Sequence, residues 1–435
     1  MKNSRREWLV SAAGLAAPAW AWKPASRVLG ANDRIRVGCI GVGGNGYGTM
    51  SNLLKWGAGA GNYEIGAVSD LYTRRKERAR GAAKLSGKDV HHDYRDLLAR
   101  ADIDAVFVSV PDHWHAPIAL DAMAAGKDVY LQKPMTLTVD EARQVAAAAK
   151  KLGRVLQVGS QHLSDRRYAV ARDMIAAGEI GTLLWAQGTY SRNSVFGEWN
   201  YRIDDEGTEA NIDWKRWLGP APKRPFSQDR YFRWRKYWDY SGGIATDLLY
   251  HRLGPLLYAM GPQFPTRISA HGGIYVQKDR EVPDTYATTI EYPDFYITMS
   301  SSMANESADD FFAATIYGNK GTVRFTNEGV EVHPEGVHAG KGAAKRVEKV
   351  LETRNLVDLH AGNFFDCMRS RMQPVLHAEF GYQVMTAIGL GVESYREGAT
   401  KLFDPAAQRV VKRAGARAGY EGDGKNHEGG NKRVR

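Results

Sequence analysis

The feature that most restricts the fold of this chain is a glycine-rich segment that directly follows an apolar run. Residues 34–40 have the composition of a buried strand, and Gly-Val-Gly-Gly-Asn-Gly at positions 41–46 stands where that strand must turn into a helix. Glycines at these spacings allow a tight turn, close approach of a pyrophosphate and close helix–strand packing. The first helical turn then offers N–H groups and positive potential to the phosphates. The sequence therefore predicts a dinucleotide site with these contacts: Gly41, Gly43, Gly44, Asn45 and Gly46.

Asp70 follows the second apolar run, at residues 63–69. A carboxylate at that position accepts hydrogen bonds from the ribose hydroxyls and repels a 2′-phosphate. This favours NAD over NADP as the cofactor. Arg74 and Arg75 follow Asp70 closely and could accommodate the extra phosphate, so NADP stays open as the alternative.

Strand patterns alternate with helical patterns as far as residue 159. Strands are expected at 34–40, 63–69, 105–110, 128–131 and 155–158. Alternation at this spacing indicates an α/β Rossmann domain with a doubly wound parallel sheet. We place this NAD-binding domain at residues 32–159.

The pattern changes beyond residue 159. Strand-like runs then follow one another without intervening helices, at 267–276, 285–292, 296–303, 313–317, 322–326 and 330–333. This order is typical of an α+β domain with a large, mainly antiparallel sheet. We assign residues 160–412 to this domain and expect the Gly- and Lys-rich residues 413–435 to form a disordered basic tail.

The positive charge of the chain is concentrated at its ends. Of the formal net charge of +10, residues 1–30 carry +4 and residues 409–435 carry +5, which leaves +1 for the residues between them. A nucleic-acid-binding surface on the folded part therefore has little support. The two cysteines, Cys39 and Cys367, lie far apart in apolar stretches and are expected to be buried free thiols.

Residues 1–31 have the features of a twin-arginine signal peptide. Arg5 and Arg6 precede an apolar run at 9–21, which ends in the small-residue sequence Ala-Trp-Ala. The run is too short to span a bilayer comfortably, which takes roughly 20 residues. We predict export through the twin-arginine machinery, to the periplasm or otherwise out of the cytoplasm, without stable membrane insertion. Because this route carries folded proteins, a cofactor can be loaded before export.

Pro111, Asp112, His113 and His115 follow the strand at 105–110, at the carboxyl edge where open α/β sheets bind ligands. Two histidines at this spacing are one pattern of metal ligands. No cysteine or carboxylate cluster of suitable spacing accompanies them, so no metal site is predicted. We predict that the segment lines the nicotinamide side of the cofactor site. A capping or packing role for either histidine is nearly as consistent with the sequence.

Three further residues have positions suited to catalysis. Lys133 follows the strand at 128–131, where partial desolvation in a crevice shifts an amine pKa toward catalysis. Asp247 and His251 are four residues apart and would share one face of a helix. His251 could take a hydroxyl proton while hydride leaves the same carbon, with Asp247 orienting the imidazole or holding the substrate. A merely structural hydrogen bond between the two is the alternative.

Read in order, these segments resemble the glucose–fructose oxidoreductase / inositol dehydrogenase / MocA family across nearly all of the mature sequence. The resemblance is carried by the glycine loop, residues 111–115, residues 124–134 and the pair Asp247 and His251. It implies a Rossmann domain, a second domain whose open sheet often mediates homo-oligomerisation, and oxidation of a secondary alcohol in a sugar, polyol or related molecule. By position it makes Lys133, Asp247 and His251 catalytic and His115 a cofactor-side residue.

One position departs from the family pattern. The family usually has Glu-Lys-Pro, whereas here Gln132 precedes Lys133 and Pro134. Loss of that carboxylate removes a favourable neighbour of the ammonium group. A cis bond between Lys133 and Pro134 is common in the family.

The stretch at 193–240 is rich in Trp, Tyr and Arg and has no clean period. Aromatic faces beside hydrogen-bonding groups suit a carbohydrate ring. Packing of these aromatics within the domain or on a second subunit is equally consistent with the pattern. The predicted substrate contacts are Gln161, His162, Trp238, Asp239 and Tyr240.

Three functions fit these patterns. The first is an NAD-dependent oxidoreductase that acts on a sugar, glycoside or polyol. The second is a glycosidase that uses tightly bound NAD in an oxidation–elimination–reduction cycle, and export favours it because free NAD is scarce outside the cytoplasm. The third is a non-catalytic sugar-binding protein, against which the intact Lys133, Asp247 and His251 argue.

Overall fold

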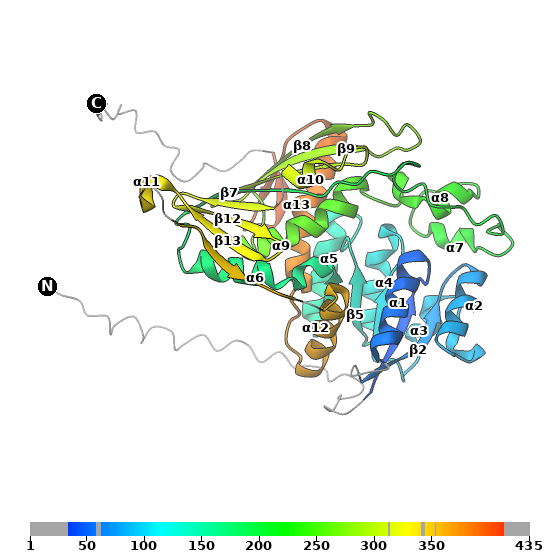
Figure 1. The fold of residues 1–435 in the computed structure, drawn as a ribbon. Helices are drawn as coiled ribbons and strands as arrows, with labels where there is room; N and C mark the ends of the chain where they lie inside the picture. Colours follow the sequence, from blue (N-terminus) through cyan, green and yellow to red (C-terminus); the bar gives the residue numbers. More distant parts are fainter. Residues whose placement is uncertain (1–33, 58–61, 312–313, 341–343, 353, 413–435) are drawn as a thin grey trace, which may run out of the picture.

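The computed structural model describes residues 34–57, 62–311, 314–340, 344–352 and 354–412 (Figure 1). The expected export signal at 1–31 and the expected basic tail at 413–435 lie outside the described residues. Within the described residues, no helix is long and apolar enough to cross a membrane.

The N-terminal half is built on a six-stranded parallel sheet with strands in the order β3-β2-β1-β4-β5-β6. Its strands are β1 (Ile35–Ile40), β2 (Tyr63–Ser69), β3 (Val90–His91), β4 (Ala105–Val108), β5 (Asp128–Gln132) and β6 (Leu156–Gly159). β1 pairs with β2 on one side and β4 on the other, so the strand order reverses beside β1. A ligand crevice forms at such a reversal, outside the carboxyl ends of the strands. The predicted doubly wound parallel sheet is confirmed.

Five helices connect these strands: α1 (Gly44–Gly57), α2 (Thr73–Ala82), α3 (Tyr94–Leu98), α4 (His115–Ala124) and α5 (Val139–Leu152). α5 begins with a capping box in which Thr138 and Glu141 exchange side-chain and backbone hydrogen bonds. α1 begins at Gly44, inside the glycine loop. The loop is therefore the first helical turn, whose N–H groups have no acceptor within the helix.

The second half carries a ten-stranded sheet in the order β14-β13-β12-β11-β7-β10-β9-β8-β15-β16. Its strands are β7 (Leu183–Thr189), β8 (Arg267–Gly273), β9 (Thr285–Glu291), β10 (Tyr296–Ser302), β11 (Thr315–Gly318), β12 (Gly321–Thr326), β13 (Gly329–Pro334), β14 (Arg346–Lys349), β15 (Lys401–Asp404) and β16 (Arg409–Val411). β7 and β10 are parallel and the other described pairs are antiparallel. The prediction of a mainly antiparallel sheet is confirmed, although β14, β15 and β16 were not expected.

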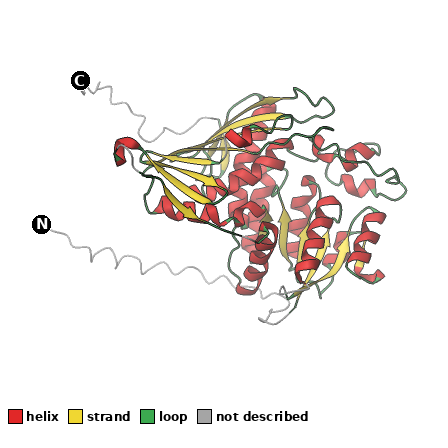
Figure 2. Ribbon diagram, in the orientation of Figure 1, coloured by secondary structure: helices red, strands yellow, loops and turns green. Residues whose placement is uncertain are grey.

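Helices cover one face of this second sheet (Figure 2). They are α6 (Arg166–Ala176), α9 (Tyr250–Met260) and α13 (Ala378–Glu397). Because α13 also packs on α5, the two halves of the chain share one large apolar core.

The helix α12 (Leu356–Ser370) returns to the first sheet, although it follows the second-domain strands β7–β14 in the chain. Its Phe364 and Phe365 pack against Phe107 and Tyr130 of the parallel sheet. Cys367 of the same helix and Cys39 of β1 are buried and free, as expected.

Candidate active site

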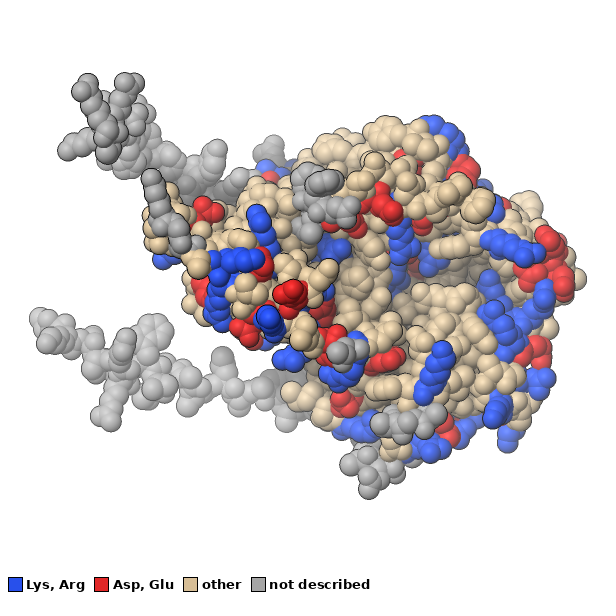
Figure 3. Space-filling model, in the orientation of Figure 1, with Lys and Arg blue, Asp and Glu red and all other residues tan. Residues whose placement is uncertain are grey.

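A cavity of about 1240 Å³ begins at the carboxyl ends of β1, β2 and β4 and extends to residues of the second domain. Lys and Arg side chains gather near α2 and the short helix α8 (Gln228–Phe232) on the same side of the molecule (Figure 3). The cavity is lined by these predicted site residues: Gly41, Gly43, Gly44, Asn45, Gly46, Asp70, Pro111, Lys133, Gln161, Asp247 and His251.

The glycine loop fits a dinucleotide because two of its positions have no room for a side chain. Gly41 has φ +79°, and a Cβ there would overlap the carbonyl oxygen of Ser109. A Cβ at Gly46 would overlap the carbonyl oxygen of Gly41. At Gly44, by contrast, nothing beyond the local chain lies within 4 Å of the Cβ position, so bare backbone faces the cavity. This is the cradle that a pyrophosphate requires.

Asp70 is held at the edge of this cradle by two backbone amides. Val42 N donates to one carboxylate oxygen and Tyr72 N to the other, each at 2.9 Å. Each carboxylate oxygen has a further lone pair, so the group keeps acceptor capacity toward the cavity. Arg74 is paired with Asp204 at 2.8 Å, whereas Arg75 packs over the Tyr231 ring, 4.9 Å from its centroid.

The centre of the cavity is a buried ion pair. Lys133 Nζ lies 2.6 Å from Asp247 Oδ1 and 2.5 Å from the backbone oxygen of Asp247. Arg235 Nε lies 3.1 Å from the same Oδ1, and Trp199 Nε1 donates to Oδ2 at 2.9 Å. Burial opposes ionisation of Asp247, but the charges of Lys133 and Arg235 outweigh it and lower the pKa of the carboxyl. The Lys133–Pro134 bond is cis, and Gln132 lines the cavity beside it.

His251 does not pair with Asp247 in the way that a regular helix would allow. Residues Ala245–Leu249 form a π-helical turn, and α9 begins only at Tyr250. His251 Nδ1 lies 3.0 Å from Ser160 Oγ instead. The expected role of Asp247 in orienting the imidazole is therefore corrected, because the wider turn breaks the spacing and Ser160 contacts the ring nitrogen.

His251 is neutral in the folded protein and can therefore accept a proton. Burial, followed by the charge of Lys133, lowers the pKa of His251 well below 6.5, so the ring is neutral at neutral pH. When Nδ1–H donates to Ser160, Nε2 is left as the basic nitrogen.

Three members of the 111–115 segment are packing residues and do not line the cavity. His113 Nε2 contacts the carbonyl oxygen of Trp217 at 3.0 Å, and the His115 ring lies 2.6 Å from the carbonyl oxygen of Pro134. Asp112 is buried with a hydrogen bond to Ser241. Of the two interpretations that the sequence allowed for the histidines, the structure favours packing, and His115 braces the turn that carries Lys133.

The predicted substrate contacts divide in a similar way. Gln161 lines the cavity, and His162 lies behind it, with its ring centroid 5.1 Å from that of His251. Tyr240 is fully buried and does not line the cavity.

Trp238 and Asp239 also lie away from the cavity. Trp238 contacts Tyr395, and Asp239 pairs with Arg224 at 2.7 Å and with Arg230 at 3.2 Å. Residues 238–240 therefore do not line this cavity, because nearness to Asp247 in sequence does not set side-chain direction in an irregular segment.

Several residues that line the cavity were not predicted, among them Tyr190, Arg192, Tyr201 and Arg235. The buried Trp199, which donates to Asp247, was not predicted either. Trp199 and Arg235 belong to the stretch at 193–240 that is rich in Trp, Tyr and Arg. Its composition indicated the region of the site but not which residues contribute to it. Tyr190 and Arg192 follow β7, and only the course of that strand reveals their direction.

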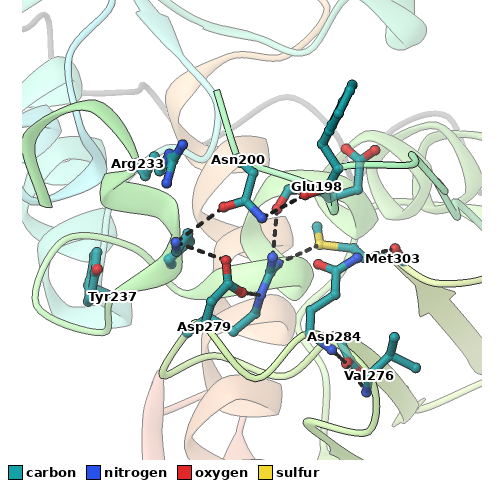
Figure 4. Close-up of polar contacts among 12 residues, drawn as sticks. Glu198, Asn200, Arg233, Tyr237, Val276, Asp279, Asp284 and Met303 are labelled. Atoms are coloured by element: carbon teal, nitrogen blue, oxygen red, sulfur yellow. Dashed lines mark hydrogen bonds and ion pairs between the residues drawn. The ribbon is translucent and has the colours of Figure 1, made fainter. Parts of the chain in front are cut away.

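A network outside the cavity fixes the segment that carries Trp199 (Figure 4). Arg280 Nη2 donates to the carbonyl oxygen of Glu198 at 2.7 Å, and its guanidinium lies 5.5 Å from the Trp199 ring centroid. Lys236 Nζ bridges Asn200 Oδ1 at 3.2 Å and Asp279 Oδ2 at 3.0 Å. Arg280 and Lys236 thus fix the backbone and side chains of residues 198–200, and this orients the Trp199 indole N–H toward Asp247.

Comparison with known proteins agrees with this arrangement. The family model described as "Oxidoreductase family, NAD-binding Rossmann fold" (GFO_IDH_MocA) matches residues 35–160. Its companion, "Oxidoreductase family, C-terminal alpha/beta domain", matches residues 194–420.

Two curated relatives match part of the chain. An inositol 2-dehydrogenase of Rubrobacter xylanophilus is 34% identical over 195 residues, which is 43% of this chain and 53% of that protein. A glycosyl hydrolase family 109 protein of Shewanella baltica is 32% identical over 167 residues, 36% of this chain and 35% of that protein. The matches thus span about half and about a third of these relatives.

Among solved structures, a levoglucosan dehydrogenase in complex with NADH superposes with a TM-score of 0.65 at 18% identity. The superposition covers 85% of this chain and 98% of that one. At this identity the likeness shows a shared fold.

Proposed function

The chain belongs to the Gfo/Idh/MocA oxidoreductase family, and from this premise we propose that it is an NAD-dependent enzyme that oxidises or reduces a secondary alcohol of a sugar, glycoside or polyol. One observation carries the proposal. Lys133, held by Asp247, and the neutral His251 line the same cavity as the glycine loop.

The reaction divides between the cofactor and the side chains. Bound NAD supplies a hydride acceptor for the carbinol carbon. Lys133 donates a hydrogen bond to the substrate oxygen, and Asp247 keeps the ammonium in place. His251 Nε2 takes the hydroxyl proton as the C–H hydride leaves, so that one proton and one hydride are removed and a ketone forms. In the reverse direction the same ring returns the proton.

The direct test is a screen of sugars and polyols in which nicotinamide absorbance reports turnover. We expect His251→Ala to lower kcat by at least roughly 100-fold, the usual scale for general acid–base catalysis, with NAD content unchanged. His333→Ala on β13, a histidine outside the cavity, is the control and keeps full activity. Protein that neither contains nor binds NAD would refute the proposal.

A glycosidase that recycles bound NAD is the second candidate, favoured by the partial match to the family 109 glycosyl hydrolase. Aryl glycosides separate the two. Release of the aglycone without net change in nicotinamide absorbance supports the glycosidase, and a stoichiometric absorbance change supports the dehydrogenase. Sugar binding by the unmodified protein without either activity would instead indicate a non-catalytic sugar-binding protein.

We also propose that residues 1–31 direct export through the twin-arginine pathway and that the NAD is tightly bound. A retained cofactor suits a compartment where free NAD is scarce. Fusion of residues 1–31 to a reporter tests the first point, with export blocked by Arg5→Lys combined with Arg6→Lys. Gel filtration followed by heat release of nicotinamide tests the second.

We propose further that the uncovered face of the second sheet joins copies of this chain. Trp185 stacks between Tyr317 and Tyr296 on that face, with ring centroids 4.2 and 5.8 Å away. Aromatic rows exposed on a sheet are typical of interaction surfaces. Light scattering of the protein and of Trp185→Asp measures the oligomeric state, and an unchanged mass would exclude this face.

A further inference from the structure

Arg192 lines the cavity and forms no ion pair with a carboxylate among the described residues. It follows β7, and its backbone N donates to the carbonyl oxygen of Ser302 at 2.9 Å, which fixes the base of the side chain. The guanidinium is partly buried and lines the cavity. Within the described chain no carboxylate lies within 4.0 Å of it, whereas Arg235 is paired with Asp247 and Arg233 with Asp229.

The Tyr190 ring contacts both the Arg192 guanidinium and His251. The guanidinium lies 5.4 Å from the centroid of the Tyr190 ring, and Nη2 donates to the Tyr190 hydroxyl at 3.3 Å. The same ring is edge-on to His251, 6.0 Å between centroids. Arg192 therefore faces the space that a substrate bound at His251 must occupy.

The charges around this space do not balance. Lys133 and Arg235 share the carboxylate of Asp247 within ion-pair distance, and the buried Asp112 acts on both only at longer range. Asp247 and Glu198 also act on Arg192 only at longer range, beyond ion-pair distance. Arg202 also lines the cavity, and within the described chain no carboxylate lies within ion-pair distance of it. Arg202 is exposed, whereas Arg192 is partly buried. A partly buried cation without a counterion is costly, and an anion bound at Arg192 would offset that cost.

We propose that the substrate is an acidic sugar whose anionic group, a carboxylate or a phosphate, is bound by Arg192 while the reacting hydroxyl lies at Lys133 and His251. The inference rests on the proposed function and names the substrate class of that site. A guanidinium presents a planar fork of donors that matches either oxyanion in bidentate fashion. The Tyr190 hydroxyl engages only part of this fork.

The test compares a hexose, its uronic acid and its 6-phosphate on the NAD-loaded protein. We expect kcat/KM for one of the acids to exceed that for the hexose by about 10- to 100-fold, the range of a hydrogen-bonded charge pair. Arg192→Gln should raise KM for the acid by a similar factor, and it should change KM for the hexose far less. Arg192→Lys should recover only part of the affinity, because the fork is lost.

Arg172→Gln is the matched control, since this arginine lies on α6, paired with Asp173 and outside the cavity. It should change neither KM. Preference for the uronic acid identifies a carboxylate, and preference for the sugar phosphate identifies a phosphoryl group. Equal or better turnover of the hexose, or equal loss for both substrates in Arg192→Gln, would overturn the inference.

A binding measurement with the same three probes, monitored by tryptophan fluorescence, tests the anion site independently of turnover. Absence of turnover with every sugar would count against the oxidoreductase. Tight binding of an acid that Arg192→Gln abolishes would still establish the anion site, and absence of such binding would refute it.

Discussion

At the scale of single residues, the proposed base His251 is oriented by Ser160, which the sequence spacing did not indicate. Ser160 Oγ lies 3.0 Å from His251 Nδ1, and a second serine–histidine pair, Ser164 Oγ and His360 Nδ1, lies at 2.8 Å outside the cavity. Comparing these two serine–histidine hydrogen bonds allows the catalytic contribution to be separated from the structural one.

We expect Ser160→Ala to lower kcat about 10-fold, because the imidazole loses the partner that fixes its orientation and tautomer. Ser164→Ala should leave kcat unchanged. Each variant should lower the free energy of unfolding by about 1 kcal/mol, the usual net value of such a bond. Steady-state kinetics and urea unfolding measure both quantities. If Ser164→Ala slowed turnover as much as Ser160→Ala, orientation of His251 by Ser160 would not explain the loss.

At the scale of elements, the π-helical turn and the loop at 198–200 meet on Asp247. The turn presents the carboxylate to Lys133, and the loop delivers the Trp199 indole N–H at 2.9 Å. Removing that donor while keeping an aromatic ring isolates its effect.

Trp199→Phe should therefore raise the pKa of Asp247 and lower kcat about 10-fold, because a carboxylate that loses a buried donor is less stable as an anion. Trp214→Phe is matched to it, since Trp214 Nε1 donates to the carbonyl oxygen of Arg224 at 2.7 Å and lies outside the cavity. Steady-state kinetics should show a lower kcat in the first variant only. An equal fall of kcat in both variants would mean that Trp199 acts through packing alone.

At the scale of the whole molecule, local sequence patterns predicted those features of the fold that are determined by residues close together in the chain. Alternating strands and helices gave the parallel sheet, and a lysine at the end of β5 lies in the cavity as expected. The hydrophobic period of a helix shows which face is buried, but it does not show which element that face packs against. Nothing in the sequence of α12 indicated that Phe365 would pack onto the first sheet. Trp238 and Trp199 come from one aperiodic stretch, but in the fold Trp238 packs on Tyr395, whereas Trp199 donates to Asp247.

Burial of many titratable groups makes the stability of the whole fold depend on pH. Burial lowers the pKa of four histidines to about 4: His113, His115, His162 and His360. The unfolded chain binds these protons near pH 6.5. Unfolding therefore takes up protons between pH 6.5 and 4, so the contribution to stability is complete above pH 6.5 and is lost as pH falls toward 4.

Asp112 acts in the opposite sense, because burial raises its pKa to about 7. Its contribution is present below pH 4 and is lost as pH rises toward 7. The histidines outnumber it, so the free energy of unfolding of the NAD-saturated protein should fall on acidification from pH 6.5 to 4.5, by on the order of 1.4 kcal/mol per pH unit for each excess proton. Urea titrations across this range should give a shallower slope for His360→Gln and a steeper one for Asp112→Asn. Stability that is flat or rises on acidification would show that the buried histidines stay protonated in the folded protein.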